Sequence, residues 1–247
     1  MALIPYLMGG FPDLGVTRDM VLAAEQAGAA VVELGIPFSD PLADGPAIQA
    51  AGQIALGNRV TVGKVLELVA SLRQQTAVPL VAMSYINPLL SYGIERFAAD
   101  ARSSGLDGLI VPDLPVEEAG EVEARLIEKG LDLIMLVAPT SAPDRIALAS
   151  SHSHGFIYCV SLRGVTGARA ALAGDVMRLL EQVGKVSKVP RALGFGISTP
   201  EQVRSVRGHT EAVVVGSALI DLALRHRGHE ATEVGRFVGE LVAAAGD

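Results

Sequence analysis

Eight short apolar runs, rich in β-branched residues and bounded by turn residues, recur along the whole chain. Polar and apolar positions do not alternate within these runs, so each is predicted to be a strand buried on both faces, as in a parallel sheet. The predicted strands are Ala2–Met8, Ala30–Gly35, Pro79–Tyr85, Gly108–Val111, Leu131–Ala138, Phe156–Ser161, Arg191–Gly194 and Ala212–Gly216.

Helical patterns lie between these runs. Val116–Lys129 carries one apolar stripe and stops before a glycine, and Thr17–Ala27 stops in the same way. The segment 199–202, Thr-Pro-Glu-Gln, predicts a helix start with an N-cap, a first-turn proline and a capping-box glutamine. Two further helices are predicted at Ser217–Arg225 and Thr232–Ala244.

Strand and helix therefore alternate eight times, with no linker, low-complexity stretch or charge run between them. This order predicts an α/β fold, a (β/α)8 TIM barrel, formed by residues 1–247 as a single domain. The length of 247 residues is also the usual size of one such barrel.

Composition excludes several classes of protein. The net charge of −7 argues against a nucleic-acid binder, which usually needs a basic face. Cys159 is the single cysteine, so we expect no intrachain disulfide and no cysteine-based zinc site. The start has no basic signal-peptide region, and no apolar run approaches the roughly 20 residues of a membrane span. We expect a soluble cytoplasmic protein with no membrane partner.

Two intervals between predicted strands are longer than the rest. The second strand starts at 30 and the third at 79, a gap of 49 residues, and the sixth and seventh start at 156 and 191, a gap of 35. Extra chain after a barrel strand lies at the C-terminal end of the barrel, the mouth, where barrel enzymes carry their chemistry. The loops after the second and sixth strands are therefore expected to form part of a site.

Two carboxylates are the strongest catalytic candidates. Glu33 interrupts an apolar strand, and burial without a partner raises the pKa of a carboxyl into the range useful for proton transfer. A structural carboxyl near the barrel mouth is an equally good interpretation of Glu33. Asp44 lies in a loop stiffened by three prolines, which suits a carboxylate held over a pocket. Taken alone, however, Asp44 favours plain turn chemistry, because Asp-Pro and Asp-Gly are common turn dipeptides.

Glycines after three late strands predict a phosphate site of the phosphate-binding barrels. Gly164–Gly167, Gly194–Gly196 and the pair Gly216 and Ser217 place backbone N–H groups where barrels often bind phosphate. Ordinary tight turns are the alternative. A dinucleotide fingerprint is excluded because Thr199 occupies its third glycine position. No metal site is expected, since no strand-end histidine or carboxylate completes a ligand set.

The segment 32–46, Val-Glu-Leu-Gly-Ile-Pro-Phe-Ser-Asp-Pro-Leu-Ala-Asp-Gly-Pro, resembles the signature segment of the tryptophan synthase alpha subunit family. The three glycine blocks match later blocks of that family in order and at compatible spacing. The resemblance covers nearly the whole chain and implies retro-aldol cleavage of indole-3-glycerol phosphate to indole and glyceraldehyde 3-phosphate.

The resemblance also implies residue roles. The residue matching Glu33 is the general acid and base, and the one matching Asp44 assists at the indole nitrogen. The residue matching Thr166 closes with the loop after the sixth strand towards Asp44. Residues matching Gly167, Gly196, Gly216 and Ser217 hold the phosphate. Pocket residues implied in the same way are Tyr6, Ile48, Met83, Tyr85, Tyr158 and Phe195.

A partner is implied as well. Family members bind a beta subunit in an α2β2 heterotetramer, and pyridoxal phosphate belongs to that subunit, so no cofactor is expected in this chain. Interface candidates, which turn chemistry would explain equally well, are Pro37, Asp40, Asn87, Asp113 and Pro115. Members usually carry an N-terminal helix before the first strand, which here begins at Ala2, so the barrel floor is expected to be trimmed or covered differently.

The sequence is compatible with other functions. The main alternative is a stand-alone indole-3-glycerol-phosphate lyase or another phosphate-binding barrel enzyme. A partner-activating binding module with a dead site is the non-enzyme alternative, and the presence of both Glu33 and Asp44 argues against it.

Overall fold

The computed structural model describes residues 1–160, 169–194 and 196–246. The predictions for Gly164, Thr166, Gly167 and Phe195 fall outside the described residues.

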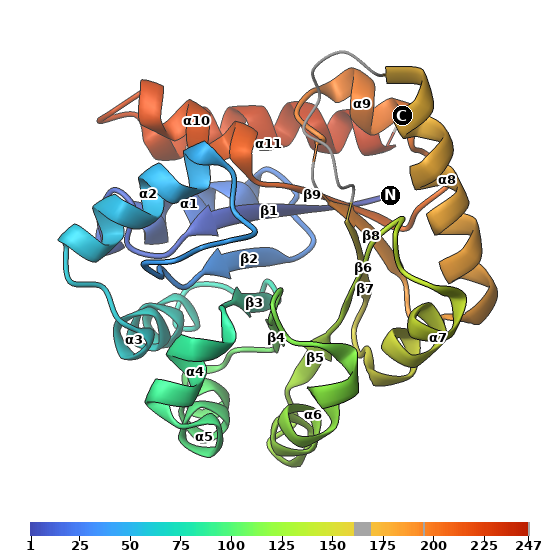
Figure 1. The fold of residues 1–247 in the computed structure, drawn as a ribbon. Coiled ribbons are helices and arrows are strands. Elements are labelled where there is room, and N and C mark those ends of the chain that lie inside the picture. The colour runs from blue at the N-terminus through green and yellow to red at the C-terminus, as the bar shows by residue number, and fades with distance from the viewer. Residues whose placement is uncertain (161–168, 195, 247) are drawn as a thin grey trace.

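Nine strands within the described chain form one sheet in the order β5-β4-β3-β2-β1-β9-β8-β7-β6. All neighbouring strands are parallel. Figure 1 shows the strands grouped at the centre with the helices around them, so the predicted barrel is confirmed. The strands are β1 Ala2–Met8, β2 Val32–Gly35, β3 Leu80–Met83, β4 Gly108–Ile110, β5 Asp132–Ile134, β6 Leu136–Val137, β7 Ile157–Val160, β8 Arg191–Gly194 and β9 Ala212–Val215.

The fifth predicted strand is divided in the structure, which gives nine strands where eight are expected. β5 pairs with β4, whereas β6 pairs with β7. Met135 lies between them, and its N–H donates to Ser153 Oγ at 3.0 Å while its carbonyl accepts from the Tyr158 N–H at 2.9 Å. The run therefore changes neighbour at Met135 and brings the two ends of the sheet together through continuous chain.

Helices cover the outer face of the sheet (Figure 1). They are α1 Leu14–Gln26, α2 Pro46–Gly57, α3 Val62–Leu72, α4 Ile86–Tyr92, α5 Ile94–Ser104, the 3-10 turn η1 Val116–Glu118, α6 Ala119–Glu128, α7 Pro143–His152, α8 Arg169–Val186, α9 Pro200–Ser205, α10 Ser217–Arg225 and α11 Glu230–Gly246.

Local end signals explain most of the helix boundaries. The capping box of α9 is present, with the Gln202 N–H donating to Thr199 Oγ1 and the Thr199 N–H donating to Gln202 Oε1. α1 begins three residues before the predicted Thr17, because the Asp13 carboxylate caps it by accepting from the Val16 N–H at 2.9 Å. The predicted helix 116–129 starts as a 3-10 turn and continues as α6.

The two long intervals differ in what they contain. After β2, residues 36–45 form a loop, called loop 2 below, and the extra helix α2 follows it. In the interval between the sixth and seventh predicted strands, which are β7 and β8 in the structure, the 18 residues of α8 account for much of the length. The extra chain after β2 therefore lies at the mouth as predicted, whereas most of the extra chain described after β7 is a helix.

Residues of β2 face two environments. Successive strand residues point to opposite faces, so Val32 and Leu34 share one face and Glu33 lies on the other. All three are buried, with at most 1% of Glu33 exposed. Tyr6 of β1 is the register partner of Glu33. The fold thus places one carboxyl among the inward side chains of an otherwise apolar strand.

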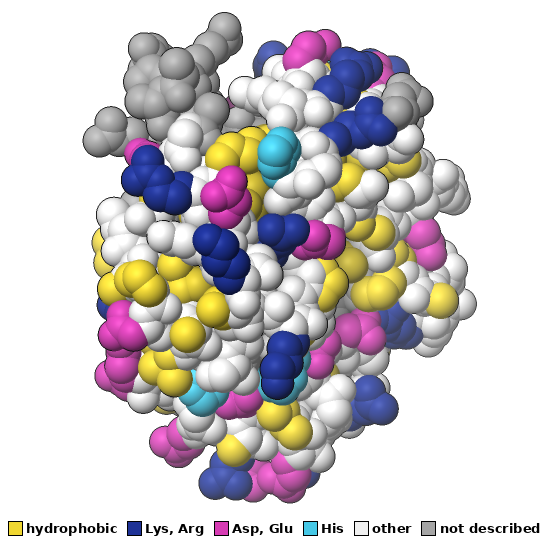
Figure 2. All heavy atoms as spheres, turned by 90° about the vertical axis from the view of Figure 1, so that its right-hand side faces the viewer, with side chains coloured by type: hydrophobic (Ala, Val, Ile, Leu, Met, Phe, Trp, Pro, Cys, Tyr) yellow, Lys and Arg dark blue, Asp and Glu magenta, His cyan; other side chains and the backbone are white. Residues whose placement is uncertain are grey.

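Charges on the surface are mixed. Figure 2 shows basic and acidic side chains interspersed over the face that it presents, with hydrophobic side chains between them. This face offers no continuous basic patch of the kind that nucleic acids bind. Within the described chain, no helix is both long enough and apolar enough to span a membrane.

Candidate active site

Glu33 carries a buried carboxyl with no hydrogen-bond partner. Both carboxylate oxygens, Oε1 and Oε2, are buried without a donor or acceptor among the described residues. Burial raises the pKa of Glu33 from 4.5 to about 8, and the nearby charge of Asp44 adds to this effect. At neutral pH Glu33 is therefore mainly protonated and able to donate a proton.

Asp44 is held at the mouth by loop 2. The Tyr85 hydroxyl accepts from the Ala43 N–H at 2.8 Å and donates to the Asp44 carboxylate. The rings of Phe38 and Tyr85 lie 5.4 Å apart, and Gln49 Nε2 donates to the Asp44 carbonyl at 2.9 Å. These contacts tie both ends of loop 2 to the barrel and so fix the position of the Asp44 carboxylate.

The two carboxyls have different pKa values. Partial burial raises the pKa of Asp44 from 3.8 to about 6, and the hydrogen bond from Tyr85 opposes that rise. Between pH 6 and 8, therefore, Asp44 is mainly ionised while Glu33 is mainly protonated. A protonated carboxyl and an ionised carboxyl close to one another are the arrangement expected when two carboxyls have different catalytic roles.

A cavity of about 860 Å³ opens at the mouth, and both Glu33 and Asp44 line it. This volume is typical of small-molecule sites. Seven of the pocket and phosphate residues proposed from the sequence also line the cavity: Tyr6, Ile48, Met83, Tyr158, Gly196, Gly216 and Ser217. The interface candidates Asp113 and Pro115 line it as well. Tyr85, proposed as a pocket residue, is not among the lining residues; its hydroxyl contacts Ala43 and Asp44 of loop 2 instead.

The N-terminus of α10 forms one end of the cavity. No side chain caps α10 at Gly216, so backbone N–H groups at its first turn remain available to an anion. α9, by contrast, is capped by its own Thr199. A Cβ added to Gly45 of loop 2 would lie 4.0 Å from Ser217 Oγ, which brings the Asp44 loop close to this helix end.

Several cavity residues carried no recognisable sequence signal. The wall opposite α10 is built by residues 112–116 and 135–138, which follow strands β4 and β5. Arg145 is the single cation among the described lining residues, and it pairs with Glu117 at 3.1 Å. Apart from Asp113 and Pro115, which the sequence indicated only as interface candidates, these positions carried no signal, and the position of their strands in the barrel identifies them.

The interface candidates differ in their exposure. Asp40, Asn87 and Pro115 are exposed, whereas Pro37 is buried within the chain and offers little surface to a partner. The exposed Asp113 accepts from the Ile86 N–H at 2.9 Å, so it has a structural role at the start of α4.

Two exposed leucines, one in loop 2 and one in α4, lie near the interface candidates in the chain. Leu42 of loop 2 is 95% exposed and Leu90 of α4 is 59% exposed. Their exposure had no sequence signal, because it depends on which elements pack against each leucine in the fold.

His152 and His154 are not among the residues that line the cavity. His152 Nδ1 and His154 Nε2 contact the two carboxylate oxygens of Glu123, at 2.5 and 2.8 Å. Among the described residues, no group of three or more histidine, cysteine, aspartate and glutamate side chains is arranged to hold a metal ion.

The fold and this cavity together define a (β/α)8-barrel enzyme with its site at the C-terminal mouth. The family model for the tryptophan synthase alpha chain matches residues 1–243. The chain belongs to the tryptophan synthase alpha chain family. Members of this family catalyse the alpha reaction, which cleaves indole-3-glycerol phosphate to indole and glyceraldehyde 3-phosphate.

Individual relatives agree with this assignment. The tryptophan synthase alpha chain of Geobacter sp. (strain M21) is 48% identical over 241 residues, 97% of this chain and 90% of the relative. That of Synechococcus sp. (strain CC9902) is 48% identical over 247 residues, 99% of this chain and 92% of the relative.

Solved structures give the same family. An alpha chain in a study of the tryptophan synthase a2b2 complex from Pyrococcus furiosus superposes with a TM-score of 0.92 at 38% identity, covering 98% of both chains. The alpha subunit from Legionella pneumophila str. Paris gives 0.89 at 34% identity, covering 99% of this chain and 92% of that one. The matches do not favour a stand-alone lyase or another barrel enzyme.

Proposed function

We propose that Glu33 and Asp44 perform the alpha reaction in the mouth cavity, with the chain acting as one barrel domain. The observation that carries this proposal is the Glu33 carboxyl, which is buried without a hydrogen-bond partner and faces a cavity shared with Asp44. A buried carboxyl without a partner is costly to stability. A group that binds and releases a proton in the reaction explains why such a carboxyl is present.

The residues divide the chemistry between them. Protonated Glu33 donates its proton to C3 of the indole ring, which gives an indolenine whose positive charge spreads to N1. Ionised Asp44 stabilises that charge. The Glu33 carboxylate then takes the proton of the glycerol hydroxyl next to the ring. The C3–C1′ bond breaks, its electron pair returns to the ring, the aldehyde forms, and Glu33 is protonated again.

We propose that the substrate phosphate binds at the N-terminus of α10. Gly216 and Ser217 supply backbone N–H groups there, and Gly196, with a φ of +88°, follows β8 beside them. The helix dipole favours an anion at this end without any positive side chain. In this arrangement the indole ring lies towards Glu33 and Asp44, and the phosphate lies at the α10 end of the cavity.

We further propose a beta subunit as partner, with pyridoxal phosphate bound to that subunit. A structural neighbour is described as part of the tryptophan synthase a2b2 complex. The exposed apolar side chains of Leu42 and Leu90 favour a protein partner on loop 2 and α4, beside Asp40 and Asn87.

The test is indole release from indole-3-glycerol phosphate by wild type, Glu33→Gln and Asp44→Asn, with and without a beta subunit. We expect Glu33→Gln to lower kcat by at least about 100-fold, because general acid–base catalysis typically contributes that much. Binding of indole-3-propanol phosphate, which keeps the ring and the phosphate, checks that the variants retain the site. Normal cleavage by a folded Glu33→Gln variant would exclude the proposed role.

A further inference from the structure

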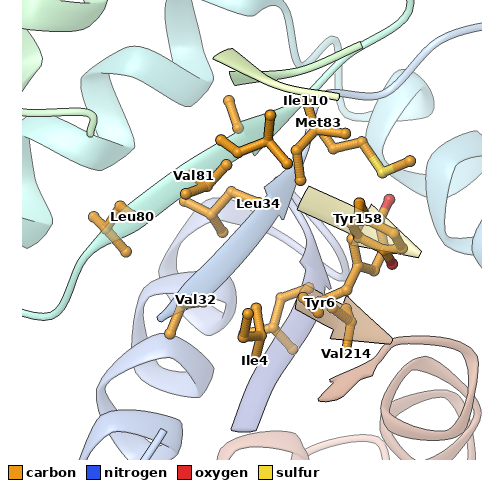
Figure 3. Close-up of a cluster of buried hydrophobic side chains, with 14 of the residues drawn as sticks. Ile4, Tyr6, Val32, Leu34, Leu80, Val81, Met83, Ile110, Tyr158 and Val214 are labelled. Atoms are coloured by element: carbon orange, nitrogen blue, oxygen red, sulfur yellow. The ribbon is translucent and has the colours of Figure 1, made fainter. Parts of the chain in front are cut away.

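The hydroxyl of Tyr6 is the least explained polar group in the cavity wall. Tyr6 is 5% exposed and lines the cavity, yet its hydroxyl makes no hydrogen bond to any described residue. Tyr158, the other tyrosine near Glu33, is already engaged in an interaction within the chain. Figure 3 shows the two tyrosines side by side, with Met83 nearby. Within the described chain, the Tyr6 hydroxyl is thus a polar group without a partner in the wall of a ligand cavity.

Two glycines determine where this hydroxyl lies. A Cβ at Gly35 would lie 2.1 Å from the Tyr6 hydroxyl oxygen, so the ring occupies space that any side chain at position 35 would fill. On the other side, a Cβ at Gly216 would lie 3.3 Å from Tyr6 Cβ. Tyr6 pairs in register with Glu33, but its ring leans two residues further along β2, over Gly35.

The hydroxyl therefore lies on the same side of β2 as the Glu33 carboxyl, one side-chain layer closer to the mouth. Residues i and i+2 of a strand share a face and are about 7 Å apart, which places the hydroxyl in the layer above Glu33. Gly216, which contacts the base of the same ring, opens the α10 end of the cavity. Tyr6 thus stands between the proposed indole and phosphate subsites.

The part of the substrate that must cross this region is the glycerol chain, which joins the indole ring to the phosphate and carries two hydroxyls. Burial raises the pKa of Tyr6 well above its ordinary value, and the charges of Asp44 and Glu33 raise it further. The phenol is therefore protonated throughout the neutral range and available as a hydrogen-bond donor.

We propose that the Tyr6 hydroxyl donates a hydrogen bond to the glycerol hydroxyl that becomes the aldehyde oxygen. The inference rests on the proposed roles of Glu33 and Asp44 and adds a specificity-determining residue to them. As Glu33 takes the proton of that hydroxyl, negative charge develops on its oxygen, and a donor already in place stabilises it. Tyr6 keeps its own proton throughout, so the proton balance of the cleavage is unchanged.

Removal of the single oxygen in Tyr6→Phe tests the proposal, because the ring and its packing on Gly35 and Gly216 are kept. Two ligands are compared in the presence of a beta subunit. Indole-3-glycerol phosphate carries the hydroxyls, and indole-3-propanol phosphate has the same ring, chain length and phosphate without them. Tyr92→Phe is the matched control, since it removes a tyrosine hydroxyl that is bonded to Asp100 on the surface.

We expect Tyr6→Phe to lower kcat/KM for indole-3-glycerol phosphate by about 10- to 100-fold, the range for loss of a donor to developing charge. The dissociation constant of indole-3-propanol phosphate should stay within about twofold of wild type, and Tyr92→Phe should change neither value. An unchanged kcat/KM, or equal weakening of both ligands, would overturn the inference. Failure of the wild type to cleave indole-3-glycerol phosphate would instead refute the proposed function.

Discussion

The buried Glu33 carboxyl predicts that stability falls as pH rises, and that Glu33→Gln abolishes this loss. Its folded-state pKa of about 8 lies above the ordinary value of 4.5. Between these two values the native state binds more protons than the unfolded state, so the free energy of unfolding decreases with rising pH. The stabilisation by the protonated form is complete below pH 4.5 and is lost as pH rises towards 8.

The size of the effect follows from the same two values. Within that window the slope is about 1.36 kcal/mol per pH unit, and the loss between pH 5 and pH 9 is about 4 kcal/mol. The side-chain amide introduced by Glu33→Gln keeps the shape of the protonated carboxyl and cannot ionise. We therefore expect the free energy of unfolding of Glu33→Gln, relative to that of wild type, to increase by about 2 to 4 kcal/mol from pH 5 to pH 9. The lower figure applies if water in the open cavity reduces the desolvation cost of the Glu33 carboxylate.

The assay is urea unfolding of wild type and Glu33→Gln at closely spaced pH values from 5 to 9. Glu67→Gln, which removes an exposed carboxyl of α3, controls for the loss of one negative charge. The difference between the Glu33→Gln and wild-type curves should rise and then flatten near pH 8. A difference that stays constant, or that favours wild type as pH rises, would show that the carboxyl is solvated in the folded chain and refute the reasoning.

Two further predictions concern the reaction itself. The active form needs Asp44 ionised and Glu33 protonated, so kcat/KM should follow a bell-shaped pH profile with limbs near pH 6 and pH 8. These two values belong to the coupled pair of carboxyls. A flat profile from pH 5 to 9 would contradict the division of roles. Tyr85→Phe removes the oxygen that holds Ala43 and Asp44, so kcat should fall about 10-fold while the free energy of unfolding falls by about 1 kcal/mol or less. Indole release and urea unfolding measure both values, and an unchanged kcat would remove Tyr85 from the positioning of Asp44.

Much of the fold could be predicted because the signals are local. The run Ala2–Met8 and the helix Ser217–Arg225 have the predicted bounds, and the capping box at Thr199 is present. The division of the run Leu131–Ala138 at Met135 could not be predicted, because its cause is a pair of hydrogen bonds to residues 153 and 158. The early start of α1 depends on Asp13, a capping residue that the predicted start at Thr17 does not include.

The candidate site could be predicted in part. A glutamate within an apolar strand and an aspartate in a proline-rich loop were visible as candidates, and the structure brings both to one cavity. The hydrogen bonds of Tyr85 to loop 2, the orientation of Tyr6 and the exposure of Leu42 had no sequence signal. Each depends on residues that are distant in the chain, such as Tyr85 and Ala43.

The amino-acid sequence by itself determined the order of strands and helices, the barrel and the residue types available at its mouth, since hydrophobic periodicity and end signals act over a few residues. The tertiary structure alone decided which carboxyl is protonated and which polar groups face the cavity without a partner. The physical reason is that the desolvation, the pKa and the hydrogen bonds of a group depend on all the atoms within a few ångströms of it. Closure of the barrel brings these neighbouring atoms together from separate strands.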